Sequence, residues 1–245
     1  MRIVKKWLVL LFSVFFLTAC GGNKGLAEKD AANVLVDAIF YNKQTTLFKE
    51  NFSNANKTLK TIYGDENFSF TEKFAKSFTS TLSADIPEDD AKKIADAMEK
   101  VVKKQTKYKV KSIKEKKSGV YQVTYEVYGL NFIKGYKLAL NNTYEEILKN
   151  QNAFQDNTQV QKEFVQAMGK NIQAGGIVKK PIEIKLDLIK KQDKWTIAKN
   201  QNTKLQNMAM ALFLGVKDIQ TLFNDVKNAT VDITQEFQEK ALQNQ

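Results

Sequence analysis

The chain has 245 residues, of which 43% are hydrophobic and 11% aromatic, and its formal net charge is +11. This length and composition are those of a folded protein with a real core, and they exclude wholesale disorder. The sequence contains no histidine, and Cys20 is its single cysteine. Ser-His-Asp and Cys-His catalysis, zinc sites built on cysteine or histidine, and a disulfide within the chain are therefore excluded.

The first 25 residues are arranged like a secretory signal. Residues 2–6 carry one arginine and two lysines, and residues 7–17 form an almost wholly apolar run. This run is shorter than the roughly 18 residues that a membrane-spanning helix needs. The sequence Leu17-Thr18-Ala19-Cys20 resembles the bacterial lipobox. The resemblance implies cleavage between Ala19 and Cys20 and attachment of a diacylglyceryl group to the Cys20 thiol.

This reading divides the chain into a signal peptide (residues 1–19), a flexible tether (20–27) and a single α+β domain with a C-terminal helical extension (28–245). The mature protein is then extracytoplasmic and anchored to the cell membrane by a lipid on Cys20. Three positive charges leave with the signal, so about +8 remains on the mature chain. Export argues against a nucleic-acid partner. Two kinds of partner then remain for the positive charge, anionic lipid headgroups and anionic wall polymers. The alternative is a lysine-rich surface that is simply solvated and has no partner.

Helices are expected in the first part of the body. Apolar residues recur at helical spacing between residues 28 and 41, and a shorter helical piece is expected around Leu47 and Phe48. A capping-box pattern at residues 69–72 starts another helix, whose stripe is formed by Phe70, Phe74, Phe78 and Leu82. Core packing explains this stripe better than a ligand-binding aromatic ladder.

Residues 85–90 contain four acidic side chains and open a helix that continues to about residue 102. The acids suit the positive end of the helix dipole, and Pro87 suits the first turn. A calcium site is the alternative. The acids lack the alternating spacing and the central glycine of a calcium-binding loop, so helix capping is preferred.

Two segments alternate between apolar and polar residues and predict β-hairpins, at residues 107–128 and 180–199. Trp195, on the last strand, is expected in the core rather than in a binding site. Between the hairpins the pattern is helical from 132 to 172, with Asn131 as a candidate cap and a short strand at 136–140 as an alternative. A long helical pattern follows from residue 205, with a joint at Gly215 and a polar end at 232–245 that is expected to fray.

The predicted fold class is therefore α+β. An antiparallel sheet of two hairpins, about four strands, packs against several helices, with N-terminal helices, a helical insertion between the hairpins and C-terminal helices. The lipobox, the helix Ala-Ala-Asn-Val-Leu-Val-Asp-Ala-Ile-Phe-Tyr-Asn-Lys and the hairpin Lys-Lys-Gln-Asp-Lys-Trp-Thr-Ile resemble uncharacterised lipoproteins of low-GC Gram-positive bacteria. The resemblance implies a sheet similar to the nuclear-transport-factor-two or cystatin type, and it brings no catalytic residues.

The resulting prediction is a surface lipoprotein whose body is a non-catalytic binding module, with no cofactor and no metal. An envelope polyanion, an exported protein or a small molecule is the expected partner. One alternative is an envelope enzyme that uses carboxylates, such as a glycan hydrolase, which needs two carboxyl groups facing each other across a cleft. Another is a foldase or chaperone-like lipoprotein. A solute receptor with two parallel-sheet lobes is not favoured, because the strands form hairpins.

Overall fold

The computed structural model describes residues 25–63, 87–150 and 157–243. The helices before the sheet are α1 (Glu28–Phe40), α2 (Thr45–Asn51), α3 (Ala55–Tyr63) and α5 (Glu88–Gln105). The first hairpin is β1 (Lys107–Lys117) and β2 (Val120–Tyr128), and the inserted helices are α6 (Phe132–Lys149) and α7 (Asn157–Ala174). The second hairpin is β3 (Ile182–Lys191) and β4 (Lys194–Ile197), and the chain closes with α8 (Asn202–Leu214) and α9 (Ile219–Gln243).

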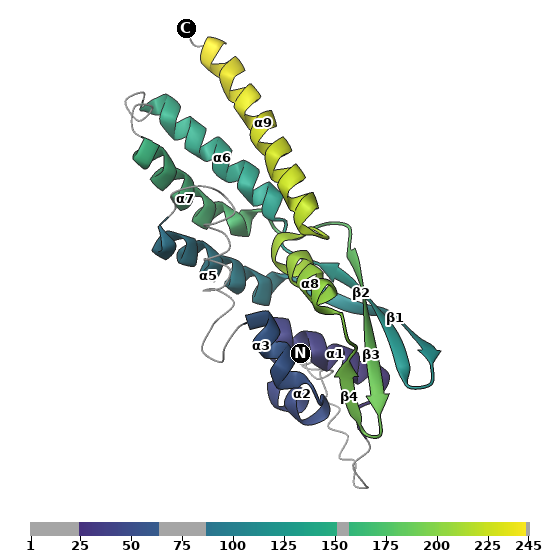
Figure 1. Cartoon of the computed structure of the whole chain (residues 1–245). Coiled ribbons are helices and arrows are strands. Elements are labelled where there is room, and N and C mark those ends of the chain that lie inside the picture. Colours follow the sequence, from purple (N-terminus) through teal and green to yellow (C-terminus); the bar gives the residue numbers. More distant parts are fainter. Residues whose placement is uncertain (1–24, 64–86, 151–156, 244–245) are drawn as a thin grey trace, which may run out of the picture.

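The four strands form one antiparallel sheet in the order β1-β2-β3-β4, which confirms the predicted α+β class (Figure 1). β2 and β3 pair in register, so Val123 stands opposite Leu186. The two hairpin turns lie at the same end of the sheet, because the backbone N–H of Lys190 donates to the carbonyl of Gly119 at 2.8 Å. The inserted helices lie at the other end, where β2 leads into α6 (Figure 1).

One face of the sheet is closed by helices. Val123, Tyr125 and Leu186 point from this face and are fully buried. α8 contacts β2 and β3, and α1 contacts β1. The hydroxyl of Tyr125 donates to the carbonyl of Ala32 in α1 at 3.0 Å, which satisfies the one polar atom that this side chain takes into the core.

Trp195 lies in the core, as the alternation predicts, and has no exposed surface. Its indole N–H donates to the carbonyl of Leu26 at 2.9 Å, and its ring lies 5.4 Å from that of Tyr121, centroid to centroid. The chain just before α1 is therefore held against the second hairpin. Gly25 lies so close to the turn of this hairpin that an added Cβ would be 2.1 Å from the carbonyl oxygen of Asp193.

α6, α7 and α9 lie side by side and extend away from the sheet (Figure 1). The rings of Tyr144 and Phe237 stack at 4.5 Å, and the hydroxyls of Tyr136 and Thr230 are 2.9 Å apart, so α9 follows α6 along its length. The alternative strand at residues 136–140 is wrong. Tyr136 and Ala139, three positions apart, are buried on one face of α6. A five-residue window is too short to separate this helical spacing from the alternation of Tyr136, Leu138 and Leu140.

Other local predictions can be compared with the structure. Asn131 caps α6, since its side-chain oxygen accepts from the backbone N–H of Lys134 at 3.3 Å. Gly215 ends α8 in the left-handed conformation, with φ of 66°, and confirms the predicted joint. α9 continues to Gln243, so the polar end expected to fray is helical over residues 232–243. The predicted helix at 69–82 lies outside the described residues.

Candidate functional site

The outward side of the sheet carries the largest set of polar side chains in the strands. Because side chains alternate along a strand, β2 and β3 place apolar residues under the helices and polar residues on the opposite side. We call this side the polar face. It is formed by Lys109, Lys111, Lys116, Gln122, Thr124, Glu126, Glu183, Lys185 and Asp187.

Two carboxylates meet at the end of the polar face nearest α6. Glu126 and Glu183 are direct partners across β2 and β3. The ammonium group of Lys111 lies between them, in contact with Glu183 and 3.3 Å from Oε1 of Glu126. Lys109 adds a further ion pair to Glu126 at 3.4 Å. One acid on each strand thus shares the same cation.

These contacts decide the charge state of Glu126. The hydrogen bond from Lys111, with help from Lys109, lowers the pKa of Glu126 despite its partial burial. The hydrogen bond from Lys111 to Glu183, followed by the one to Glu126, raises the pKa of Lys111. Glu126 is therefore an ionised carboxylate at neutral pH. A general acid for glycoside cleavage needs the opposite shift, a pKa raised toward neutrality.

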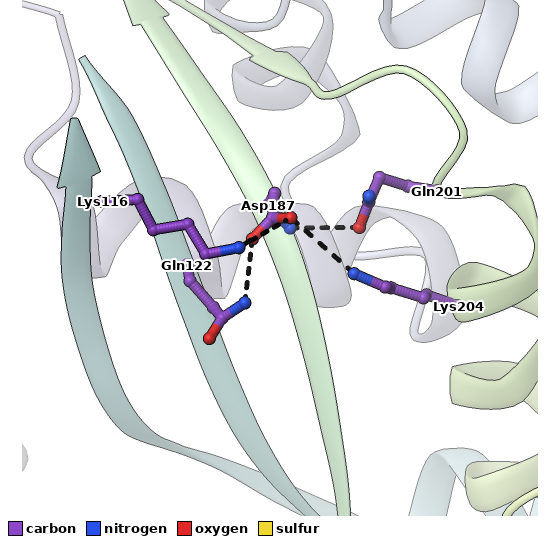
Figure 2. Close-up of polar contacts among 5 residues, drawn as sticks. All are labelled: Lys116, Gln122, Asp187, Gln201 and Lys204. Atoms are coloured by element: carbon purple, nitrogen blue, oxygen red, sulfur yellow. Dashed lines mark hydrogen bonds and ion pairs between the residues drawn. The ribbon is translucent and has the colours of Figure 1, made fainter. Parts of the chain in front are cut away.

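The second polar cluster is centred on Asp187 (Figure 2). Its carboxylate accepts a hydrogen bond from the side-chain amide of Gln122 at 3.1 Å and pairs with Lys116 at 3.2 Å. Lys204, from the first turn of α8, lies 3.7 Å away. The side chain of Asp187 is only 16% exposed. Burial opposes its ionisation, but the hydrogen bonds from Lys116 and Gln122 and the charge of Lys204 hold its pKa below the usual value.

Gln201 completes this cluster at the point where β4 stops pairing with β3. β4 pairs with β3 only from Leu188 onward, so the backbone N–H of Asp187 has no strand partner. The side-chain oxygen of Gln201 accepts from this N–H at 3.1 Å (Figure 2). Asp187 therefore ties three strands to the start of α8, which is a structural role.

A partly buried polar cluster also lies where α1 meets β1. The Tyr108 hydroxyl donates to Oδ1 of Asp37 at 2.8 Å, and the Gln44 side chain donates to Oδ2 at 2.8 Å. Burial, together with the hydrogen bond to Asp37, strongly raises the pKa of Tyr108. Its hydroxyl stays protonated, as a donor to Asp37 requires, so this cluster fastens α1 to the sheet.

Hollows lie between the helices. One of about 390 Å³ lies between α5 and α7, with Ile94 and Val165 in its floor and Asp90, Lys93 and Lys162 at its rim. Another of about 470 Å³ lies between α6 and α7 and is lined mainly by polar side chains. Among the described residues, neither hollow has a buried, unpartnered polar side chain directed into it.

The predicted anchor residues and the less favoured calcium alternative can be compared with the described residues. Ala19 and Cys20, the cleavage and lipid-attachment residues, lie outside the described residues. Among the acids considered for calcium, Glu88, Asp89 and Asp90 lie in the first turn of α5, where Asp90 pairs with Lys93 at 2.8 Å. In the part of the chain that the structure describes, no three acidic residues gather as a metal site would need.

The sequence by itself does not single out Glu126, Glu183 or Asp187. The alternation in each hairpin places these residues on the outward side of its strands, so part of the signal was available. Which acid faces which lysine depends on the pairing of β2 with β3 across a helical insertion of about fifty residues. The periodicity of either hairpin alone does not contain this register.

The described residues thus define a single-sheet α+β domain with a closed apolar face, an open polar face and a helical projection. A comparison with protein families matches residues 22–213 to a domain of unknown function, DUF5105. The chain therefore belongs to this family. The match ends close to the end of α8, so α9 lies beyond it. The comparison with curated proteins found no match.

Among solved structures, the fold is similar to the crystal structure of YcdA from Bacillus subtilis subsp. subtilis str. 168, which has been assigned provisionally as a lipoprotein. The TM-score is 0.54 and the sequence identity 15%, over 75% of this chain and 55% of that chain. The match thus spans about half of that protein, and at this identity it supports the shared fold. None of the helices within the described ranges is long and apolar enough to cross a membrane.

Proposed function

We propose that this protein is a lipoprotein anchored to the cell membrane through Cys20, and that its body is a non-catalytic binding module that uses its outer surface. Two observations support the anchor. The sequence Leu17-Thr18-Ala19-Cys20 has the lipobox pattern, and the similar fold of YcdA belongs to a protein provisionally assigned as a lipoprotein.

The proposal of surface binding rests on the closed apolar face of the sheet. A curved sheet can hold a ligand in a hollow on its apolar face, lined by apolar side chains and a few polar groups. Here that space is filled by side chains, since Val123, Tyr125 and Leu186 have no exposed surface. The polar face is open, and Lys185 near its centre is exposed and has no ion pair in the described structure. A partner is thus expected to contact the polar face.

The anchor is tested by replacing Cys20 with alanine. We expect the wild-type protein in the membrane fraction with a diacylglyceryl mass on an N-terminal cysteine. The Cys20→Ala variant should retain its signal residues and lack the lipid. Identical masses and identical fractionation of the two proteins would refute the anchor.

Surface binding is tested by crosslinking in intact cells. A photoreactive amino acid at position 185 should give an adduct with an envelope component. Lys227 in α9 is also exposed and has no ion pair among the described residues, so the same probe at 227 is the matched control. Adducts of equal yield from both positions, or none from 185, would contradict a binding role for the polar face.

One observation favours an enzyme as the second candidate. Glu126 and Glu183 face each other across two strands, and two facing carboxylates are what a glycan hydrolase needs. The lowered pKa of Glu126 and the shared lysine argue against it. Purified protein should leave envelope glycan strands intact. If the wild-type protein hydrolyses the strands and both Glu126→Gln and Glu183→Gln abolish this activity, the protein is a glycan hydrolase and the proposed binding role is wrong.

A further inference from the structure

We propose that the end of the sheet that carries the two hairpin turns binds an anionic phospholipid surface. We call this end the turn end and define it as residues 114–119 and 190–194. The proposal takes the orientation of the protein from the lipid anchor proposed above. The binding itself is a separate property, because it arises from side chains of the folded domain.

The structure brings the N-terminal part of the described chain to the turn end. The two turns touch through the hydrogen bond from Lys190 to the carbonyl of Gly119. Gly25 lies against Asp193 in the turn of the second hairpin, and Lys190 forms an ion pair with Glu28 at 3.4 Å. Gly25 is five positions after Cys20, and five extended residue steps span at most about 18 Å. A lipid on Cys20 would therefore hold the turn end as the part of the sheet nearest the bilayer.

The turn end has a strong positive charge. Its eleven residues include six lysines and two acidic residues. Glu115 is held within its own turn, where its carboxylate accepts from the backbone N–H of Gly119 at 2.9 Å. Lys114, Lys117 and Lys191 are exposed and form no ion pair with any described residue. These three cations are free to meet an external anion.

The helical end of the molecule differs in charge. α6, α7 and α9 together contain seven lysines and seven acidic residues, so their net charge is zero. The turn end therefore carries a net charge of +4, about half of the surplus of about +8 on the mature chain, at the end where the chain leaves for the membrane.

The contact should be electrostatic and shallow. Each lysine near an anionic leaflet contributes about 1 kcal/mol, and the attraction fades within a Debye length of about 8 Å at physiological salt. The large hydrophobic side chains that are exposed in the described structure, Ile219, Phe223, Val231 and Leu242, all belong to α9. The turn end thus offers charge without an apolar group to insert.

Vesicle binding by the mature chain, residues 20–245 with Cys20→Ser so that no lipid is attached, tests the proposal. We expect co-sedimentation with vesicles of phosphatidylglycerol and phosphatidylcholine in equal parts, no binding to phosphatidylcholine alone, and loss of binding in high salt. The variant Lys114→Gln, Lys117→Gln, Lys191→Gln should bind about a hundredfold more weakly, from the contribution of three lysines. The three corresponding arginine substitutions should restore binding.

A matched control removes the same charge from the helical end. Lys134, Lys162 and Lys227 are exposed and unpaired among the described residues, and their triple glutamine variant should bind like the wild type. Circular dichroism checks that both variants are folded. Equal binding by the turn-end variant and the wild type, equal loss in both variants, or binding to soluble polyphosphate but not to vesicles would overturn the proposal. Vesicle binding with no lipid found on Cys20 in cells would refute the anchor and leave this surface standing.

Discussion

The two faces of the sheet are made from the same strands but are stabilised by different forces. Towards α1 and α8, Tyr125 and Trp195 are fully buried and their polar atoms donate to backbone carbonyls. On the polar face, charged side chains pair in the presence of water. Apolar burial and core packing are worth several kcal/mol per large side chain, whereas an exposed ion pair contributes about 0–1 kcal/mol. The closed face should therefore hold the fold, and the polar face should be free to change for binding.

The largest effect is expected from Trp195→Ala. This side chain is fully buried, and its removal leaves a cavity and frees the carbonyl of Leu26. We expect a loss of about 3–5 kcal/mol in the free energy of unfolding, measured by urea denaturation. The control Trp195→Phe keeps most of the apolar volume and should lose clearly less. Equal losses would mean that the hydrogen bond, rather than packing, dominates at this position.

A pair of glycines gives the next comparison. An alanine Cβ at Gly129, between β2 and α6, would lie 1.7 Å from the carbonyl oxygen of Ala211 in α8, so Gly129→Ala should destabilise the protein by about 1–3 kcal/mol. Gly169 is exposed in α7 and an added Cβ meets no atom within 4 Å. Gly169→Ala should stabilise by about 0.5–1 kcal/mol. Thermal denaturation of both variants measures the sign of each change in stability. A change of the same sign in both variants would contradict the packing described for β2 and α8.

Asp187→Asn tests the partly buried cluster on the polar face. The pKa of Asp187 is lowered in the folded protein, so its charge stabilises the fold above its ordinary pKa of 3.8, and this contribution is lost as the pH falls through the folded value. We expect the variant to lose about 1 kcal/mol at pH 7. The difference should shrink below pH 3.8. Denaturant titrations at several pH values measure it, and a difference that grows in acid would contradict the assigned charge state.

The smallest effect is expected at Lys185, on the same strand as Asp187. Its side chain is exposed and has no ion pair among the described residues, so Lys185→Ala should change the unfolding free energy by less than about 0.5 kcal/mol. The same urea denaturation measures it. A loss as large as that of Asp187→Asn would show that the open part of the polar face also holds the fold, and the contrast between the two faces would fail.

The local elements of this protein follow from its sequence alone. Alternation located both hairpins and placed Trp195 in the core, and helical spacing located α1, α5 and the inserted helices. The lipobox-like pattern of residues 17–20 predicts Cys20 as an anchor without any structure. These features depend on neighbours along the chain, for which residue type and period carry the physical signal.

How these elements meet depends on contacts between segments that are distant in the sequence. The pairing of β2 with β3 brings Glu126 opposite Glu183, and it does so across the whole of α6 and α7. The contact of Lys190 with Gly119 and of Gly25 with Asp193 gathers two turns and the N-terminal segment at one end of the sheet. Such contacts depend on packing and on hydrogen-bond register between distant segments, which local periodicity does not specify. The charge of each lysine is in the sequence, but the concentration of that charge at one end is a property of the fold.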